Sequence, residues 1–244
     1  MSVTRAAQAA RLARRLAGAA LAAVFPADCL LCAAPLPWRQ EGSVCVPCWE
    51  RIAWTPGYRP APPAGDGGGG PSGGALAGVA WAADYAGAPR RLIHGFKFEG
   101  MDYLGRPLGR AAAARLLPLL RALPACDLVV PVPLHPLRRL RRGFNQSLIL
   151  AGAFAAATGS PLAPRLLRRT GAGRRQVGLG RRDRLTALEG CFRTRAGVRA
   201  ALRGRRVLLV DDVTTTGATL AACARVLGVA GAESVTGCVV ARTP

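Results

Sequence analysis

Two adjacent carboxylates followed by small hydroxyl residues are the part of this sequence best equipped for chemistry. Asp211 and Asp212 follow the apolar segment 207–210, which we expect to be a buried strand. A loop and then a helix over 218–227 come next, so backbone N–H groups and a helix N-terminus would converge on one point and form a phosphate cradle. The loop adds hydroxyl donors, and its glycine allows the backbone to approach a ligand closely. The cradle residues are Thr214, Thr215, Thr216, Gly217, Ala218 and Thr219.

The paired carboxylates suit a ligand whose hydroxyls need acceptors, or a nearby Mg²⁺ ion, and ribose 5-phosphate combines hydroxyls with a phosphate. The segment 207–219 resembles the phosphoribosyl pyrophosphate (PRPP) motif of type I phosphoribosyltransferases. A response-regulator receiver would need a later aspartate, and the 32 residues after Asp212 contain none. A Walker B strand would need a Gly-x-x-x-x-Gly-Lys-Ser/Thr loop, which this chain lacks. An ordinary buried strand ending in a turn does not account for two carboxylates followed by four threonines.

Lysine is almost absent from the chain. Of the 34 cationic residues, 33 are arginine, and Lys97 is the exception. A compact ammonium donor beside a phosphate is a role that arginine fills less well, so Lys97 is a candidate catalytic residue together with the two aspartates. A lysine on a solvated helix face is the alternative interpretation.

Length and charge limit the class of protein. The 244 residues suffice for one α/β domain of ordinary size and a small module. The net charge of +21 favours anionic partners such as phosphorylated metabolites or nucleic acid. A composition rich in Arg, Ala, Gly and Pro also arises from coding bias without any ligand. Aromatic residues make up only 5%, which counts against the usual base-stacking platform for single-stranded nucleic acid.

Four cysteines in two pairs predict a structural zinc site. The pairs are separated by twelve residues, and four thiolates close a tetrahedral site with no open position for chemistry. The candidate zinc ligands are Cys29, Cys32, Cys45 and Cys48. Two disulfides or a redox pair are the alternatives, but disulfides conflict with the cytoplasmic location that we expect. The other four cysteines lie in apolar settings and are expected in the core.

The first residues mimic a secretory signal only weakly. Arginines precede a short apolar stretch, which runs straight into the cysteine cluster, and an amphipathic helix is the better interpretation. No stretch is long and apolar enough to span a membrane, so we expect no stable membrane insertion. The expected location is cytoplasmic.

Strands and helices alternate along the rest of the chain, which predicts a mostly parallel α/β sheet covered on both faces. Ligands of such sheets bind at the carboxyl ends of the strands, where the aspartate pair falls. We expect strands at 78–85, 127–132, 207–210 and 235–240, and helices at 89–98, 104–120, 145–157 and 218–227. The expected parts are an amphipathic helix over 1–28, the zinc module over 29–54, a Pro/Gly-rich linker over 55–75 and an α/β domain over 76–244.

A stiff proline-rich loop follows the strand at 127–132 and leads into a basic segment. In the folded sheet it can lie next to the aspartate pair, where it would meet the pyrophosphate end of a sugar ligand. His135 could donate to phosphate, or it could simply be solvated in a turn. The candidate residues of this loop are Val132, Pro133, His135 and Arg138.

Five features of the chain occur in the order found in the ComF family, the amidophosphoribosyltransferase-like competence proteins of bacterial DNA uptake. They are the paired cysteines, the segment 92–97, the segment 130–135, Arg142-Gly-Phe-Asn-Gln146 and the segment 207–219. The chain departs from similar proteins at Ala187 and Cys191, and it is stretched at 171–175. The arginine-rich segment 165–184 could be a flap that closes over PRPP, a nucleic-acid contact or a solvated basic loop.

This resemblance implies a zinc ribbon joined to a type I phosphoribosyltransferase fold. The aspartate pair would bind the ribose hydroxyls, the loop 214–219 the 5-phosphate, and the loop 132–138 would face pyrophosphate. Two functions follow. One is a phosphoribosyltransferase that binds PRPP with Mg²⁺, whose acceptor and turnover are open. The other is a non-catalytic module of the DNA-uptake machinery that binds nucleotides, single-stranded DNA or uptake proteins. A purely structural zinc adaptor would leave the aspartate–threonine segment unexplained.

Overall fold

The computed structural model describes residues 28–36, 43–61, 76–170 and 190–244. The chain divides into two compact units, residues 1–52 and residues 53–244. The expected N-terminal helix over 1–28 lies almost entirely outside the described residues. In the first unit, the short helix α2 (Val46–Glu50) carries the second cysteine pair at its start.

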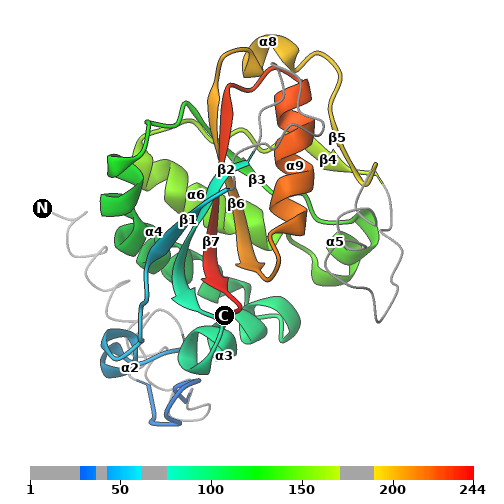
Figure 1. Cartoon of the computed structure of the whole chain (residues 1–244). Helices are drawn as coiled ribbons and strands as arrows, with labels where there is room; N and C mark the ends of the chain where they lie inside the picture. The colour runs from blue at the N-terminus through cyan, green and yellow to red at the C-terminus, as the bar shows by residue number, and fades with distance from the viewer. Residues whose placement is uncertain (1–27, 37–42, 62–75, 171–189) are drawn as a thin grey trace, which may run out of the picture. The chain divides into compact units, whose positions relative to one another are not determined.

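A five-stranded sheet forms the centre of the second unit, with the strand order β1-β2-β7-β6-β3 (Figure 1). All neighbours in it are parallel except β1 and β2, which are antiparallel. The strands are β1 (Gly57–Pro60), β2 (Leu76–Asp84), β3 (Leu128–Pro131), β6 (Arg206–Thr214) and β7 (Ser234–Arg242). The predicted fold class, a mostly parallel α/β sheet, is confirmed.

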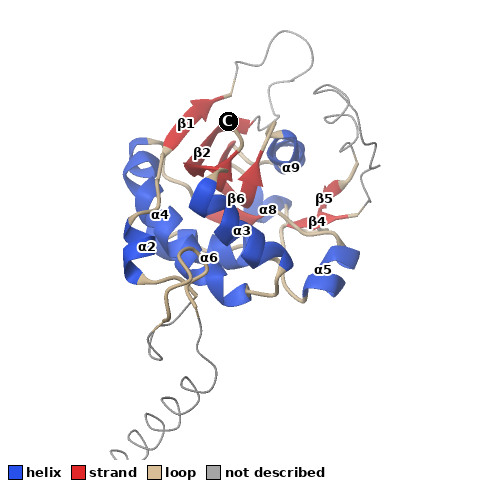
Figure 2. Ribbon diagram, turned by 90° about the horizontal axis from the view of Figure 1, so that it is seen from below, coloured by secondary structure: helices blue, strands red, loops and turns tan. Residues whose placement is uncertain are grey.

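Helices cover both faces of this sheet, as expected. On one face α4 (Gly105–Ala122) packs against α6 (Gln146–Thr158) and both contact strands, while α9 (Ala218–Val229) covers the other face (Figures 1 and 2). The helix α3 (Gly87–Phe98) lies by the carboxyl ends of the parallel strands (Figure 1). The shorter elements are η1 (Asp102–Leu104), α5 (Pro136–Arg142) and α8 (Arg199–Leu202), with β4 (Leu167–Arg169) paired to β5 (Phe192–Thr194).

The segment expected to be a linker contains the edge strand β1. Residues 57–60 pair with β2 although the strand begins with glycine and ends with proline, because an edge strand bonds to one neighbour only and tolerates both. The ring of Trp81 occupies the space that a side chain at Gly57 would need. Residues 62–75 of the expected linker lie outside the described residues.

Close packing around α4 makes a glycine-to-alanine change there costly. A Cβ at Gly105 would lie 2.5 Å from the ring of Phe96 and 2.9 Å from Ile149 Cγ2, distances that force the core to shift. We expect Gly105→Ala to lower the free energy of unfolding by about 1–3 kcal/mol, measured by urea denaturation. The control is Gly152→Ala in α6, where an added Cβ meets nothing within 4 Å, and which should stabilise the helix by up to about 1 kcal/mol. Equal effects of the two changes would contradict the packing around Gly105.

Candidate functional site

The two aspartates lie inside a strand rather than after it. The strand was expected to end at residue 210, but β6 stays paired with β7 as far as Thr214 opposite Arg242. Asp212 is only 8% exposed, so its carboxylate must be paired within the protein. The strand therefore carries both carboxylates to the edge of the sheet where the parallel strands end, the place expected for a ligand.

Lys97 is the partner of Asp212. Its Nζ atom lies 2.7 Å from Asp212 Oδ1, and both side chains are largely buried. Lys97 lies in the last turn of α3, more than a hundred residues from Asp212 in sequence, so the fold brings together the lone lysine and the aspartate pair that were singled out separately. A buried ion pair of this geometry fixes the ammonium group beside the carboxylates.

Asp211 has a different environment from its neighbour. Its Oδ1 atom accepts hydrogen bonds from Ser147 Oγ at 2.8 Å and from the backbone N–H of Asp212 at 2.9 Å. Burial and the adjacent Asp212 charge raise the pKa of Asp211 to about 7, although both hydrogen bonds and Lys97 act in the opposite direction. The two carboxylates therefore differ: one is paired with a lysine, and the other holds a proton more readily.

The raised pKa of Asp211 predicts a fall in stability with pH. Between the ordinary carboxyl pKa of 3.8 and about 7, the unfolded chain releases this proton while the folded chain keeps it, so the free energy of unfolding falls as pH rises through that window. We expect Asp211→Asn to remove about 4 kcal/mol of this decline, measured by urea denaturation from pH 4 to pH 8. The exposed carboxyl of Glu233 provides the control, and Glu233→Gln should leave the decline in place. A variant with the slope of the unmodified protein would contradict the assignment.

The loop after β6, which was predicted to be a phosphate cradle, leads directly into α9. Gly217 adopts a left-handed conformation with φ of 79° and directly precedes α9, so the first N–H groups of the helix have no partner within it. The backbone N–H of Ala218 bonds only weakly to Thr216 Oγ1, at 3.4 Å. Thr215 is exposed, whereas Thr214, Thr216 and Thr219 are half-buried.

The proline-rich loop lies beside this strand, since β3 pairs with β6. Val132 continues the pairing, with its N–H donating to the carbonyl of Val210 at 2.9 Å, and its own carbonyl accepts from Asn145 Nδ2 at 3.2 Å. Pro133 is half-buried. His135 caps α5: its Nδ1 atom accepts from the N–H of Leu137 at 3.2 Å. A neutral His135 therefore carries its proton on Nε2, where it can donate to a ligand.

Arginines gather near the carboxylate pair. Burial lowers the pKa of Arg142, the Asp212 charge opposes that shift, and the nearby charge of Arg138 adds to it. Burial and the charge of Arg138 likewise lower the pKa of Arg169, which also senses the Asp211 charge. These three guanidinium groups place positive charge beside the two carboxylates.

Sequence reasoning missed Ser147 and Arg169 as individual site residues. Ser147 directly follows the segment 142–146 that was singled out, and a hydroxyl residue at this position was the signal available in the sequence. In the structure, Ser147 is buried, with 5% of the residue exposed. Arg169 lies within the segment 165–184 that was expected to act as a flap or a nucleic-acid contact. Of that segment, residues 171–184 lie outside the described residues.

The four predicted zinc ligands come together in the first unit. Their Sγ atoms all lie within 4.8 Å of one another, and those of Cys32 and Cys45 are 3.7 Å apart. Tetrahedral zinc–thiolate bonds of about 2.3 Å place sulfurs about 3.8 Å apart, so the cluster is compatible with a structural zinc ion. Burial acts to raise the pKa of Cys29, but backbone N–H groups, that of Cys45 foremost, lower it to about 6. Such donors are what a metal-bound thiolate needs.

Known proteins share these features. Residues 159–244 match the family model of the phosphoribosyl transferase domain, and thus contain both the carboxylate pair and the threonine loop. Competence protein F of Haemophilus influenzae is 33% identical over 146 residues, which are 59% of this chain and 63% of that protein. DNA utilization protein YhgH of Escherichia coli K12 is 36% identical over 155 residues, 63% of this chain and 66% of that protein. The chain is a homologue of these proteins.

The predicted resemblance to the ComF family is therefore confirmed, although the match spans less than two thirds of each relative. Among solved structures, the glutamine PRPP amidotransferase from B. subtilis, complexed with ADP and GMP, has a TM-score of 0.40 at 21% identity, over 61% of this chain and 30% of that one. TT1426 from Thermus thermophilus has a TM-score of 0.32 at 20% identity, over 61% of this chain and 85% of that one.

Proposed function

We propose that the chain binds PRPP, or a related ribose 5-phosphate ligand, together with Mg²⁺. The binding site lies at the carboxyl ends of the parallel strands and includes Asp211, Asp212 and Lys97. The observation that carries this proposal is the convergence of the carboxylate pair, the buried ammonium group and the threonine loop at one strand end. The match of residues 159–244 to the phosphoribosyl transferase domain supports it.

Each part of the site has a distinct role in this proposal. The loop 214–219 and the start of α9 bind the 5-phosphate, and the carboxylates accept hydrogen bonds from the ribose hydroxyls. Arg138, Arg142 and His135 face the pyrophosphate, whose negative charge they offset. Lys97 holds Asp212 in place and adds a positive charge beside the leaving group.

A magnesium ion fits the donor set of this site. Carboxylate oxygens are the ligands that Mg²⁺ prefers, and Asp211 and Asp212 supply them next to the proposed phosphates. Because Lys97 already contacts Asp212 Oδ1, we expect the ligand's own oxygens to supply part of the coordination. When bound, the ion adds positive charge that stabilises departing pyrophosphate. If turnover occurs, Asp211 or Asp212 stabilises the positive charge that develops on the sugar ring.

Titrations with PRPP and with its two parts test whether the site binds the sugar phosphate and the pyrophosphate at separate positions. We expect ribose 5-phosphate and pyrophosphate each to bind more weakly than PRPP, because each fills one part of the site. Titration calorimetry with the three ligands in the presence of Mg²⁺ measures this order. PRPP bound no more tightly than pyrophosphate alone would mean that the chain recognises only clustered phosphates and that the carboxylates have no role.

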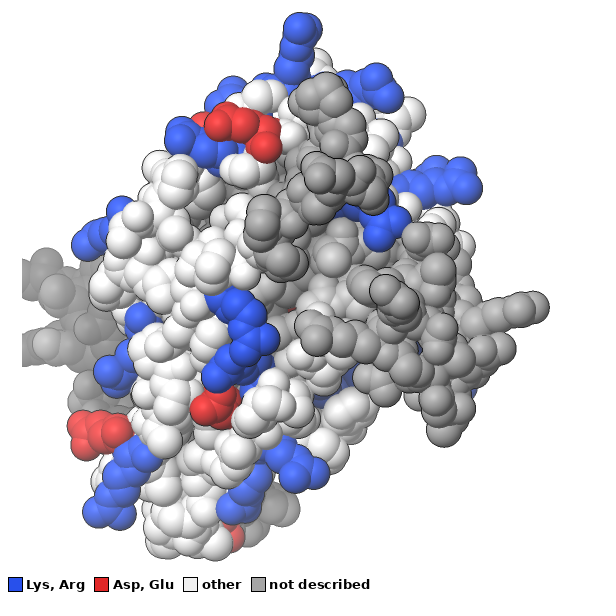
Figure 3. All heavy atoms as spheres, viewed as in Figure 1, with Lys and Arg blue, Asp and Glu red and all other residues white. Residues whose placement is uncertain are grey.

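The second candidate function is single-stranded DNA binding in a DNA-uptake role. Exposed side chains beside the proposed PRPP site favour it: the ring of Phe98 is 61% exposed, and the guanidinium of Arg142 lies 4.8 Å from its centre. The names of the two relatives concern competence and DNA utilization. Cationic side chains are spread over the face seen in Figure 3, with few acidic ones among them.

None of the described helices has the length and apolar character to cross a membrane.

Salt dependence separates the two functions. Direct contact with the DNA backbone predicts that affinity for a single-stranded oligonucleotide falls steeply between about 50 and 200 mM salt. The change Phe98→Ala removes the exposed ring and should weaken that binding about tenfold. Filter binding or fluorescence anisotropy measures the effect, with the exposed, remote Val229→Ala as control. Unchanged oligonucleotide affinity in Phe98→Ala would exclude this ring as a base contact.

A further inference from the structure

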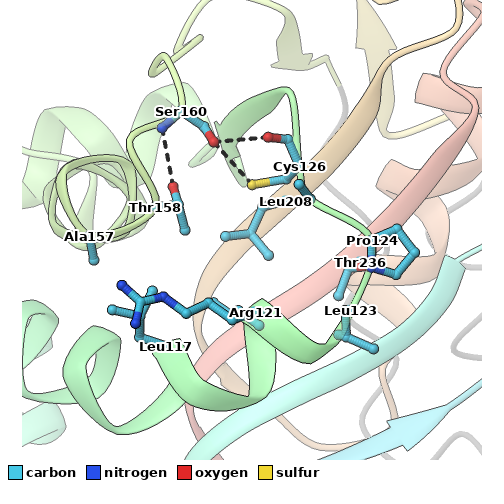
Figure 4. A pocket seen from close by; sticks show the side chains of 12 residues that line it. Leu117, Arg121, Leu123, Pro124, Cys126, Ala157, Thr158, Ser160, Leu208 and Thr236 are labelled. Atoms are coloured by element: carbon cyan, nitrogen blue, oxygen red, sulfur yellow. Dashed lines mark hydrogen bonds between the residues drawn. The ribbon is translucent and has the colours of Figure 1, made fainter.

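A pocket of about 250 Å³ lies at the end of the sheet opposite the carboxylate pair (Figure 4). Its lining includes Leu208 and Thr236, which lie near the starts of β6 and β7, whereas Asp211 and Asp212 lie near the carboxyl end of β6. The last turns of α4 and α6 form its walls. A water molecule takes up about 30 Å³ in the liquid, so the pocket has room for a small organic molecule. It shares no residue with the proposed PRPP site.

One part of the pocket is apolar. Leucines from α4, from the connection after it and from β6 supply this surface, and a ligand group placed against them would be removed from water. These residues are Leu117, Leu120, Leu123 and Leu208. The surface therefore fits a small hydrocarbon side chain.

A second part of the pocket presents hydrogen-bond acceptors. Thr158 Oγ1 donates its proton to the carbonyl of Phe154 at 2.9 Å, and Ser160 Oγ donates to the carbonyl of Cys126 at 2.9 Å. Thr158 Oγ1 also accepts a weak hydrogen bond from the backbone N–H of Ser160 at 3.4 Å, and Ser160 Oγ lies 3.3 Å from Cys126 Sγ, so each hydroxyl oxygen keeps one lone pair for a ligand and no free proton. α6 ends at Thr158, and the C-terminal end of a helix carries partial negative charge. This side therefore favours a cationic N–H donor such as an ammonium group.

The third feature is a single cation. Arg121 is the one charged residue of the lining. Its side chain lies across the pocket from Ser160 and Cys126 (Figure 4). In the described part of the chain, no acidic side chain forms an ion pair with it. A guanidinium in this position recognises a carboxylate.

We propose that this pocket binds a free α-amino acid with an apolar side chain. The ammonium group bonds to the hydroxyl oxygens of Thr158 and Ser160, the carboxylate pairs with Arg121, and the side chain lies against the leucines. A simple carboxylic acid leaves the acceptors unused, and a simple amine leaves Arg121 unpaired. The assignment rests on this pocket alone and stands or falls independently of PRPP binding.

Matched probes test each of the three contacts. Titration calorimetry of the full, zinc-loaded chain with leucine should show saturable binding. Binding should be at least about tenfold weaker for 4-methylpentanoate, which lacks the ammonium group, for isopentylamine, which lacks the carboxylate, and for glycine, which lacks the side chain. Equal affinity for leucine and 4-methylpentanoate would make the pocket a general anion site and overturn the proposal.

Variants of exposed arginines provide the matched control. Arg121→Gln should weaken leucine binding at least about tenfold, whereas Arg115→Gln, an exposed residue of the same helix outside the pocket, should have no effect. Equal affinity in both variants would remove Arg121 from the ligand contact and overturn the proposal.

The half-buried thiol of Cys126 gives an independent readout because it lines the pocket. Saturating leucine should slow its alkylation by iodoacetamide several-fold, as followed by peptide mass spectrometry. The half-exposed Thr236 also lines the pocket, and Thr236→Trp should fill the space and abolish protection by leucine. An alkylation rate unaffected by leucine, together with no heat of binding from the folded protein, would show that the pocket does not take an amino acid.

Discussion

Replacing both carboxylates, Asp211→Asn together with Asp212→Asn, is expected to weaken PRPP binding at least about a hundredfold. Each aspartate would lose a charge-assisted hydrogen bond to a ribose hydroxyl, and each such bond contributes about 1.5–3 kcal/mol. The site would also lose the negative charge that attracts Mg²⁺. Calorimetric titration of the zinc-loaded variant with PRPP in the presence of Mg²⁺ measures the loss.

The double variant should still fold. Asparagine retains a carbonyl oxygen, so residue 212 can still accept a hydrogen bond from Lys97, and residue 211 can still accept one from Ser147. A second double variant, Glu50→Gln with Glu233→Gln, removes two exposed carboxylates and serves as the matched control for net charge. Full PRPP affinity in the Asp211–Asp212 variant would rule out these carboxylates as the ribose contact.

Removal of zinc is expected to unfold the first unit while the second keeps its structure. Among the described residues of the first unit, Cys29, Val44 and Ile52 are the buried apolar ones, which is too little core for a stable fold without a metal or another cross-link. Zinc bound to four thiolates contributes on the order of 10 kcal/mol to folding in such small modules. Chelation should therefore make residues 28–52 sensitive to protease, and the thermal transition of residues 53–244 should remain.

Metal content gives the control for this prediction. Elemental analysis should find one zinc ion per chain, and Cys45→Ser should lower that number, because three thiolates hold the ion much less tightly. Cys126→Ser, a half-buried cysteine outside the cluster, should retain the full zinc content. A chain that keeps its protease resistance after losing all metal would contradict a structural role for zinc.

The long elements of this fold could be predicted because their patterns are regular. The apolar run 207–210 and the periodic leucines of α4 predict a buried strand and a helix by themselves, and both occur where expected. The four cysteines were equally readable, since two closely spaced pairs allow few alternatives. In the aspartate–threonine segment, residue types and spacing agree at several positions, and they predict a phosphate site there.

What the sequence alone could not show depends on contacts between distant residues. Ser147 and Asp211 are 64 positions apart, and nothing in either segment indicates their hydrogen bond. The pairing of Lys97 with Asp212 likewise exists only because α3 lies at the end of β6. β1 was missed because its glycine and proline are typical of loops, and only its place at the edge of the sheet accommodates them. The extension of β6 beyond residue 210 depends on its pairing with β7.

The central claim is that the edge of the sheet at Asp211 and Asp212 is a PRPP site, and titration of the zinc-loaded protein with PRPP, with and without Mg²⁺, tests it most directly. The account predicts saturable binding with one PRPP per chain and higher affinity when Mg²⁺ is present. A folded protein that releases no heat with PRPP under either condition would contradict it.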